Sequence, residues 1–427
     1  MSAPPFWILD GVRTPFVKAG GPLRDMPVYE LGRVAMGELL ARAEVDPAHL
    51  DEVVMGNCAM PAEAANSARV TAIRAGVPLP VPAATMHRNC ASGMESVAAA
   101  GYRIASGDAR LMLTGGMESM SQIPLHYTPE YAQWLEGVWR AKSPLARLGA
   151  FAKFRPRMLT PRIALAEGLT DLTCNLNMGQ TAEVLAREFR ITREQQDEFA
   201  LRSHQRTVAA RERLREEIVP VFAPPKYEMV RDDVGPRDNQ TIEALAKLKP
   251  YFDRRTGTVT VGNACQVTDG AVALLAGSDS VASKWPVPAL GRVRTFAFAG
   301  LSPARMGLGP VFAMSRALEL AGLSLADIEL FEINEAFAAQ VLACLAAAKS
   351  DAFARAELGR DRALGEIPAD RLNVNGGAIA LGHPVGASGA RLLLTLLMEM
   401  RRRGMKRGMA SLCVGGGQGA AFIVERD

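Results

Sequence analysis

Two segments that lie far apart in the chain share one pattern of apolar and polar positions. Residues 50–57 and residues 327–334 each form a short apolar run that ends in an asparagine. A segment with helical spacing of apolar residues precedes each run, at 28–43 and at 310–321. Short apolar runs of this kind are typical of strands buried on both faces of a sheet. The pattern therefore predicts a helix and then a buried strand, once in each half of the chain.

The two halves continue in the same order. In each half Ala-Ser-Gly opens a small-residue helical segment, and a strand and a glycine turn follow it. The helices are predicted at 91–107 and 387–404, the strands at 109–114 and 409–414, and the glycine turns at 115–116 and 415–417. This alternation predicts an α/β fold whose sheet is covered on both faces. We interpret the repeated order as two related halves, with chance similarity between common strand–helix units as the alternative.

The pattern breaks down between the two halves. Residues 121–180 are irregular and rich in Trp, Phe and Arg, and residues 181–217 have helical spacing, with Thr192 as the N-cap of a helix that starts near Arg193. Residues 220–252 form an excursion that contains Pro and Asp. We expect a first half at 1–120 that is completed by about 257–284, an inserted domain at 121–256 and a second half at 285–427. The strand predicted at 258–261 would return the chain to the core.

Composition narrows the function classes. The 427 residues are 48% apolar and 22% charged, as in a soluble globular protein, and no apolar stretch approaches the length of a membrane span or of a signal peptide. A net charge of +4 does not indicate nucleic-acid binding, although it suits an anionic ligand. The six cysteines lack the spacing of a zinc or redox site. We expect free thiols in a reducing compartment, the cytoplasm, and no metal.

Three small-residue turns carry the candidate chemistry. Cys90 precedes a predicted helix, whose free N–H groups and dipole are expected to lower the pKa of its thiol, and the alternative is a small buried hydrophobe. His383 lies in a glycine-bracketed loop and could take the proton of Cys90, or it could only cap a turn. Cys413 ends a strand before three glycines whose N–H groups could bind an oxyanion, and its thiol could remove an α-proton from a thioester. Asn334 could hold a water or a substrate carbonyl, serve as a helix N-cap, or do both.

Together these residues resemble the thiolases, which cleave or form 3-ketoacyl-CoA, and the resemblance covers almost the whole chain. The matching segments are Val12–Phe16, Asn89–Gly93, Gly115–Ser121, Met178–Glu183, Gly262–Ala264, Asp269–Ala271, Met306–Pro310, Asn334–Phe337, Gly382–Pro384 and Cys413–Gly417. Ten motifs in the right order make the resemblance highly specific. It implies a duplicated five-layered α/β/α/β/α core with an inserted loop domain that holds CoA, in a homodimer or homotetramer.

The resemblance also implies a role for each candidate residue. Cys90 would be acylated after His383 activates its thiol, and Cys413 would be the acid/base at the α-carbon of acetyl-CoA. Asn334, through a water, and His383 would form one oxyanion site, while the backbone N–H groups of Cys90 and Gly415 would form the other. Acyl-CoA and CoA would be the substrates, with no permanently bound cofactor.

Four positions are assigned to CoA on the same grounds. Arg231 lies where related loop domains place an arginine that contacts adenine, with a solvated surface arginine as the alternative. Asn177 and Met178 lie at the His-Met positions of short-chain thiolases, and Cys265 replaces a serine that bonds pantetheine in many members.

The insertions are longer than in compact thiolases, and in this the chain resembles the β subunits of trifunctional-type fatty-acid oxidation complexes. Those subunits commonly carry His at the position of Asn334. Residues 134–163 mix seven basic residues with aromatic and aliphatic ones against a single acid, Glu136. This segment could bind a membrane surface or a partner α subunit, or it could form a lid over the acyl tunnel.

The resulting expectation is a degradative 3-ketoacyl-CoA thiolase that acts through an acyl-Cys90 intermediate and is reversible as a Claisen condensation. A short-chain acetyl-CoA acetyltransferase is the alternative. A decarboxylating condensing enzyme would need no second cysteine, so Cys413 argues against it. A non-catalytic scaffold subunit would not need Cys90, Asn334, His383 and Cys413 together.

Overall fold

A ten-stranded mixed sheet runs through the molecule, which we describe from a computed structural model covering residues 5–426. Along the sheet the strand order is β14-β15-β16-β13-β1-β12-β5-β3-β4, and the short β2 pairs with β12. The strands are β1 (Phe6–Arg13), β2 (Val17–Lys18), β3 (Glu52–Gly56), β4 (Ala83–Met86), β5 (Leu111–Ser119), β12 (Thr268–Gly277), β13 (Gly291–Gly300), β14 (Leu330–Ile333), β15 (Arg407–Val414) and β16 (Gln418–Glu425).

The sheet consists of two halves with the same topology. In the first half β3 is parallel to β5, and β12 is antiparallel to both β5 and β1. In the second half β14 is parallel to β15, and β16 is antiparallel to both β15 and β13. The halves join where β1 pairs with β13, with Phe6 opposite Val293. The predicted duplication is therefore confirmed by strand pairing as well as by sequence order.

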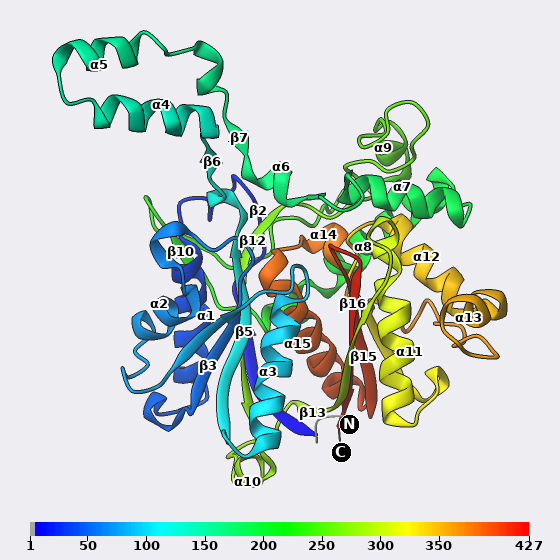
Figure 1. Ribbon diagram of the computed structural model, residues 1–427. Helices are drawn as coiled ribbons and strands as arrows, with labels where there is room; N and C mark the ends of the chain where they lie inside the picture. The colour runs from blue at the N-terminus through cyan, green and yellow to red at the C-terminus, as the bar shows by residue number, and fades with distance from the viewer. Residues whose placement is uncertain (1–4, 427) are drawn as a thin grey trace.

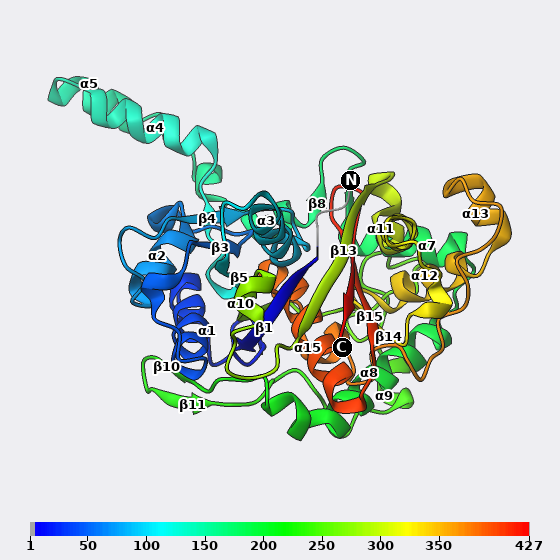
Figure 2. The same ribbon diagram turned by 90° about the horizontal axis from the view of Figure 1, so that it is seen from below.

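Helices form three layers around the two halves of the sheet. The outer helices are α1 (Val28–Arg42) and α2 (Ser67–Arg74) on the first half, and α11 (Gly309–Ala321) and α12 (Ala338–Ala348) on the second. Two central helices, α3 (Ser92–Ser106) and α15 (Val385–Arg403), lie between the halves, as Figures 1 and 2 show. The order helix, sheet, helix, sheet, helix gives the five layers that the sequence predicted.

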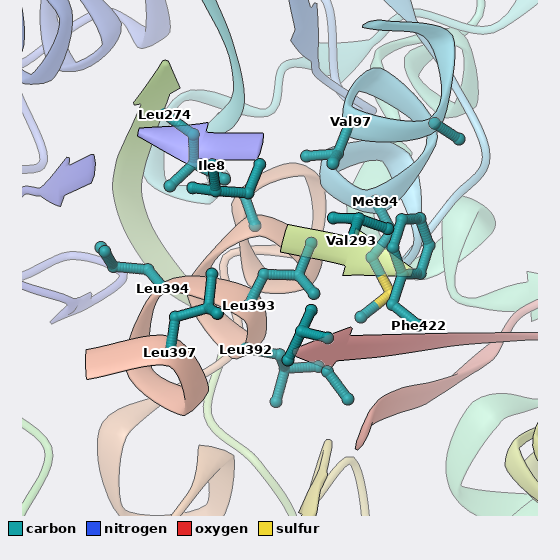
Figure 3. Close-up of a cluster of buried hydrophobic side chains, with 14 of the residues drawn as sticks. Ile8, Met94, Val97, Leu274, Val293, Leu392, Leu393, Leu394, Leu397 and Phe422 are labelled. Atoms are coloured by element: carbon teal, nitrogen blue, oxygen red, sulfur yellow. The ribbon is translucent and has the colours of Figure 1, made fainter. Parts of the chain in front are cut away.

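The central layer is held by one apolar cluster. Met94 and Val97 of α3 and Leu392, Leu393, Leu394 and Leu397 of α15 pack against Ile8, Leu274, Val293 and Phe422 of the strands (Figure 3). Each of these side chains is at most 1% exposed. Because burial of apolar area is the main driving force of folding, this cluster fixes the two central helices, whose N-termini carry the candidate site.

The segment between β5 and β12 lies outside the layers. It contains β6 (Leu125–His126), α4 (Pro129–Arg140), α5 (Pro144–Phe151), β7 (Arg162–Ile163), α6 (Ala164–Gly168), β8 (Thr170–Asp171), β9 (Leu176–Asn177), α7 (Met178–Glu188), α8 (Arg193–Arg215), β10 (Val221–Ala223), β11 (Glu228–Val230) and α9 (Ile242–Ala246). Thr192 caps α8 through a capping box, as predicted. The remaining helices are α10 (Asp279–Ala282), α13 (Asp351–Glu357) and α14 (Ala378–Leu381). Among residues 5–426, no helix is both long and apolar enough to cross a membrane.

Two local predictions were wrong. Gly115 and Gly116 are not in a turn but inside β5, where a Cβ on Gly116 would lie 2.0 Å from the carbonyl oxygen of Gly386. Gly116 therefore permits close packing of the strand against the start of α15, whereas a Cβ on Gly115 would lie 2.1 Å from the carbonyl oxygen of Val272 in β12. Residues 258–261 form no strand, and the carboxylate of Glu183 accepts hydrogen bonds from the N–H groups of Thr258 and Val259 instead.

Candidate active site

Cys90 lies in the tight turn that joins β4 to α3. The residue before it, Asn89, has a left-handed backbone with φ of 42°, and α3 begins two residues later at Ser92. The backbone N–H of Gly415, from the other half of the chain, faces the Cys90 sulfur and lowers the pKa of its thiol. Burial nevertheless raises the pKa of the Cys90 thiol, and this outweighs the lowering by the N–H groups of Gly415 and Cys90. The expectation of a lowered pKa was therefore wrong, and the thiol needs a base to become a nucleophile.

Cys413 is the next-to-last residue of β15, in the second half, and lies near the Cys90 thiol. Its side chain is 1% exposed and packs with Met178, Cys265 and Phe337 in one apolar cluster. Burial raises the pKa of Cys413 well above its ordinary value, and the neighbouring thiols of Cys90, Cys344 and Cys265 raise it further. The glycine turn that follows has left-handed backbone at Gly416 and Gly417, with φ of 88° and 76°. A protonated thiol at this point is suited to donate a proton to carbon.

His383 is buried in the loop between α14 and α15. Gly382 is required before it, because its φ is 101° and a Cβ there would lie 2.2 Å from the Thr268 hydroxyl. That hydroxyl accepts the backbone N–H of His383 at 3.0 Å. Burial, and secondarily the charge of Arg391, lowers the pKa of His383 to about 4, so the ring is neutral at ordinary pH.

The tautomer of His383 follows from Ser388 in the first turn of α15. The Ser388 hydroxyl donates to the carbonyl oxygen of Pro384 at 3.0 Å, and its oxygen lies 2.5 Å from His383 Nδ1. Since the hydroxyl has only one proton, Nδ1 carries the ring proton and donates it to Ser388. Nε2 is therefore the basic nitrogen, and it is buried with no hydrogen-bond partner among the described residues. A base of this form can accept a thiol proton.

Replacement of Ser388 by Ala is expected to slow acylation of Cys90 about 10- to 100-fold, because a buried imidazole N–H left without its acceptor costs about 1–3 kcal/mol. Single-turnover release of acetyl-CoA from acetoacetyl-CoA measures this step. Ser96→Ala is the matched control, since Ser96 is a buried serine of α3 that bonds only to Gly93, Gly115 and Thr114. Equal acylation rates for Ser388→Ala and the control would contradict the assigned tautomer.

Asn334 follows β14 at the position equivalent to Asn57 after β3. It is not an N-cap, because α12 begins at Ala338 with Phe337 in the cap position, so that interpretation was wrong. The side chain is 0% exposed, and neither its amide nitrogen nor its amide oxygen has a partner among residues 5–426. Buried polar atoms without partners are rare, and each calls for an explanation. An amide oriented toward a water or a substrate oxygen provides one.

Two buried carboxylates, which the sequence analysis missed, hold these turns in place. Glu118, at the end of β5, accepts hydrogen bonds from the N–H groups of Cys58 and Ala59 and from Gly386 N–H, beside the His383 loop. Glu335 accepts hydrogen bonds from Ser203, Asn373 and Ile379 N–H, so the residue after Asn334 is fixed to α14. Burial raises the pKa of both carboxyl groups. In the sequence, only their places in the motifs Met-Glu-Ser and Asn-Glu-Ala could have pointed to this role.

The candidate CoA residues fall into two groups. Met178 and Cys265 belong to the apolar cluster around Cys413, and the sulfur of Met178 lies 3.3 Å from where a Cβ on Gly415 would be. Asn177 caps α7, with its side chain accepting the N–H of Gln180 at 2.9 Å. Arg231 is exposed, its described ion pair is with Asp232 at 3.7 Å, and no contact joins it to the catalytic turns. Arg237 was not considered as a CoA contact in the sequence analysis, although it lies two residues after Gly235. Gly235 approaches the His383 loop so closely that an added Cβ would lie 2.2 Å from the carbonyl oxygen of Ala380.

The arrangement therefore combines a buried thiol that a base could activate, a neutral imidazole, a second thiol with a raised pKa and two groups of hydrogen-bond donors. If His383 is the base, its titration is expected to leave the rate of acyl-enzyme formation unchanged between pH 5.5 and 8. The base form is present above its pKa of about 4 and is lost only as the pH falls toward that value. Single-turnover rates across this range test the point, and a decline centred near pH 6.5 would contradict it.

Comparisons with known proteins agree with this geometry. The family model of the thiolase N-terminal domain matches residues 6–280, and that of the thiolase C-terminal domain matches residues 287–426. A 3-ketoacyl-CoA thiolase of Yersinia enterocolitica is 39% identical over 421 residues, which are 98% of this chain and 96% of that protein.

Two solved structures resemble the whole chain. The acetyl-CoA acetyltransferase of Bacillus anthracis has a TM-score of 0.86 at 35% identity, with 99% of each chain covered. Human mitochondrial 3-ketoacyl-CoA thiolase in complex with CoA has a TM-score of 0.84 at 36% identity, covering 100% of this chain and 99% of the other. With both domain models matched and relatives of this identity along its full length, the chain belongs to the thiolase family.

Proposed function

We propose that this protein is a 3-ketoacyl-CoA thiolase, an acyltransferase that uses CoA to cleave 3-ketoacyl-CoA into acetyl-CoA and an acyl-CoA shortened by two carbons. The observation that carries the proposal is the placement of two thiols from different halves, Cys90 before α3 and Cys413 near the end of β15, close enough for the Cys90 thiol to raise the pKa of Cys413. The hydrogen bond from the Asn89 amide to the Gly415 carbonyl oxygen joins the two turns. A single thiol would suffice for acyl transfer, whereas breaking a carbon–carbon bond also requires an acid at the carbanion.

The reaction has two steps. His383 Nε2 takes the Cys90 proton, and the sulfur attacks the 3-keto carbon to give a tetrahedral oxyanion. When the oxyanion collapses, the bond between the 2- and 3-carbons breaks, and the enolate of acetyl-CoA takes a proton from Cys413. CoA then enters, gives its thiol proton to the Cys413 thiolate and attacks the Cys90 thioester, and Cys90 regains its proton from His383.

Two sets of donors stabilise the negative charges in this scheme. The N–H groups of Cys90 and Gly415 face the Cys90 sulfur, where the tetrahedral oxygen develops. Asn334, through a water, and His383 serve the thioester oxygen of the enolate. The unpartnered Asn334 amide and His383 Nε2 support this second assignment.

For CoA we propose that Met178 and Cys265 contact the pantetheine near the sulfur, since both pack around Cys413. Asn177 contributes the end of α7, and Arg231 stays our proposed adenine contact. The complex of the human relative with CoA supports a CoA site in this fold. The proposed division is a first half at 1–120 with 257–284, a loop domain at 121–256 and a second half at 285–427, and the pairing of β12 with β5 and β1 supports it.

A short-chain acetyl-CoA acetyltransferase is the second candidate, because the acetyl-CoA acetyltransferase of Bacillus anthracis superposes equally well. CoA-dependent cleavage of acetoacetyl-CoA beside a long-chain 3-ketoacyl-CoA separates the two. Preference for the long chain is expected here, with Cys90→Ala as the inactive control. Activity on acetoacetyl-CoA alone would favour the acetyltransferase, and activity on neither would overturn both.

We further propose that the protein works as a homodimer or homotetramer in the cytoplasm as part of fatty-acid β-oxidation. The open edge of the sheet supports association, because β4 has a free side and its residues are half-buried in the monomer. The six cysteines are all free thiols, which supports a reducing compartment.

The hairpin of α4 and α5 is our proposed docking surface for an anionic membrane. Both views show it extending away from the body of the protein, and neither helix buries a residue, which argues against a lid (Figures 1 and 2). Trp139 is 88% exposed and Leu145 80%. A groove of about 830 Å³ between the helices is lined by Arg140, Lys153, Arg155 and Arg157 among others. Exposed apolar side chains beside basic ones suit a surface of anionic headgroups.

Replacement of both Trp139 and Leu145 by Ser is expected to reduce co-sedimentation with vesicles of phosphatidylglycerol at least tenfold and to leave acetoacetyl-CoA cleavage unchanged. Leu79→Ser is the control, an exposed leucine outside the hairpin. Unchanged vesicle binding would contradict the membrane proposal. Loss of turnover would instead assign the hairpin to the active site, and vesicle-independent capture of a partner α subunit would favour a protein interface.

A further inference from the structure

Asn89 connects the two halves of the candidate site. Its amide Nδ2 donates to the carbonyl oxygen of Gly415 at 2.7 Å, across 326 positions of sequence. The N–H of the same Gly415 faces the sulfur of Cys90, the residue after Asn89, and lowers the pKa of that thiol. Gly415 is thus held through its carbonyl oxygen by Asn89, while its N–H is directed at the nucleophile. We infer that Asn89 is a positioning residue that fixes the Gly415 N–H as an oxyanion donor relative to Cys90, an inference that rests on the proposed thiolase reaction.

The backbone of Asn89 favours this residue type. Its φ of 42° lies in the left-handed region, which Asn tolerates far better than branched or bulky residues. The conformation is supported from below, because the Asn89 carbonyl accepts hydrogen bonds from Ser92 Oγ at 2.7 Å and from the Cys58 thiol at 3.0 Å. Ser92 Oγ in turn accepts the N–H of Arg88 at 2.9 Å. The turn is therefore rigid, and the direction of the Asn89 amide is set by it.

The opposite turn, which joins β15 to β16, is held by backbone bonds at its ends: Val414 pairs with Gln418, and the Gly417 carbonyl oxygen accepts the N–H of Leu301 at 2.7 Å. Gly415, Gly416 and Gly417 have no side chains, and Gly416 and Gly417 are both left-handed. A second side-chain hydrogen bond joins the two turns. Arg88 Nη1 donates to Gln418 Oε1 at 2.9 Å, at the end of the glycine turn where β16 begins. The Arg88 guanidinium is also fixed by Glu95 and by the ring of Phe298, 4.3 Å away. Arg88 therefore anchors the outer end, while Asn89 acts on the peptide that touches the sulfur.

Geometry at this point controls the rate because the donor must meet the developing oxyanion. A displacement of about 1 Å in such a group can cost about 100-fold in rate. Both half-reactions pass through a tetrahedral oxygen on the Cys90-bound carbon, so both depend on the Gly415 N–H. Loss of the Asn89 amide is therefore expected to lower the rates of acylation and of thiolysis together, with little change in the KM for CoA.

The test compares two variants that both accept the left-handed backbone. Asn89→Gly removes the donor and keeps the conformation, and Asn89→Asp keeps the shape but replaces the donor by a carboxylate that repels the Gly415 oxygen. Both are expected to lower kcat for acetoacetyl-CoA cleavage about 10- to 100-fold. As the pH falls from 8 to 5, the activity of Asn89→Asp relative to the unmodified protein is expected to rise, because a protonated carboxyl group can again donate. Asn89→Gly has no such group and should stay flat relative to the unmodified protein.

Glu44→Gly serves as the matched control, since Glu44 is an exposed residue with left-handed backbone, φ 51°, at the end of α1. Activity of the unmodified protein in the same assay is measured first, so failure of the proposed function is recognised separately. If Asn89→Gly keeps kcat within twofold of the control, the inference is overturned. If both variants lose activity and Asn89→Asp shows no relative recovery at low pH, Asn89 has only a structural role, and the inference is overturned as well.

Discussion

Replacement of Cys90 by Ala is expected to abolish thiolysis, with a fall in kcat of at least about 10⁴-fold. Effects of this size are usual when the nucleophile is removed from a set of catalytic residues that act together. Without the nucleophile no covalent intermediate forms, so the remaining residues have nothing to stabilise. The turn should tolerate the change, because alanine can keep the packing of residue 90 against the apolar cluster of the central layer. Initial rates of 3-ketoacyl-CoA cleavage at saturating CoA measure the effect.

A matched variant separates loss of the nucleophile from loss of a thiol in general. Cys174 is a free, half-buried cysteine between β8 and β9 that bonds through its backbone N–H to Asp171. Cys174→Ala is expected to keep full activity. Residual turnover of Cys90→Ala within 100-fold of the unmodified protein would mean that another group carries the acyl chain.

Replacement of Cys413 by Ala is expected to lower thiolysis by about 10²- to 10⁴-fold, the usual contribution of a positioned acid or base. Attack of Cys90 on the 3-keto carbon requires only His383, whereas the enolate that follows has no proton source once the second thiol is gone. The variant should therefore still exchange acetyl groups between acetyl-CoA and Cys90, measured as radiolabel transferred to the protein. Cys413→Ala should therefore lose turnover but keep acetyl transfer, whereas Cys90→Ala should lose both.

Cys344→Ala provides the control for this variant. Cys344 is a fully buried thiol of α12 near Cys413 that donates to the Gly307 carbonyl oxygen at 3.1 Å. It is near enough to raise the pKa of Cys413 but packs in a separate apolar cluster, so its loss is expected to leave kcat within a few-fold. Normal turnover by Cys413→Ala would rule out the acid/base role and reopen the decarboxylating alternative.

The layered fold could be predicted from the sequence because both halves repeat one order of apolar strands and small-residue helices. The segments at 28–43 and 387–404 correspond closely to α1 and α15. The predicted thiols and the glycine turn also meet, since Asn89 donates to Gly415 and the Cys90 thiol raises the pKa of Cys413. The ends of strands and the starts of helices could be predicted because they follow local apolar patterns. The motif residues lie at these ends, and the fold brings them together at one edge of the sheet.

Features that depend on packing between distant segments could not be predicted in this way. The pair Gly115-Gly116 resembles a turn, yet it continues a strand paired with β12, where the backbone of Val272 faces Gly115 and that of Gly386 faces Gly116 too closely for any Cβ. The pKa of Cys90 depends on burial by the second half of the chain, which its own helix N-terminus does not reveal. The carboxylates of Glu118 and Glu335, and the bond from Asn89 to Gly415, join residues far apart in sequence.

The measurement that tests the account most directly is the mass of the intact protein after mixing with a long-chain 3-ketoacyl-CoA in the absence of free CoA. We expect one equivalent of acetyl-CoA to be released and the protein to gain the mass of the acyl chain shortened by two carbons. Peptide mapping should place this acyl group on Cys90, and addition of CoA should remove it. Release of acetyl-CoA without an adduct, or an acyl group on any other residue, would contradict the proposed mechanism.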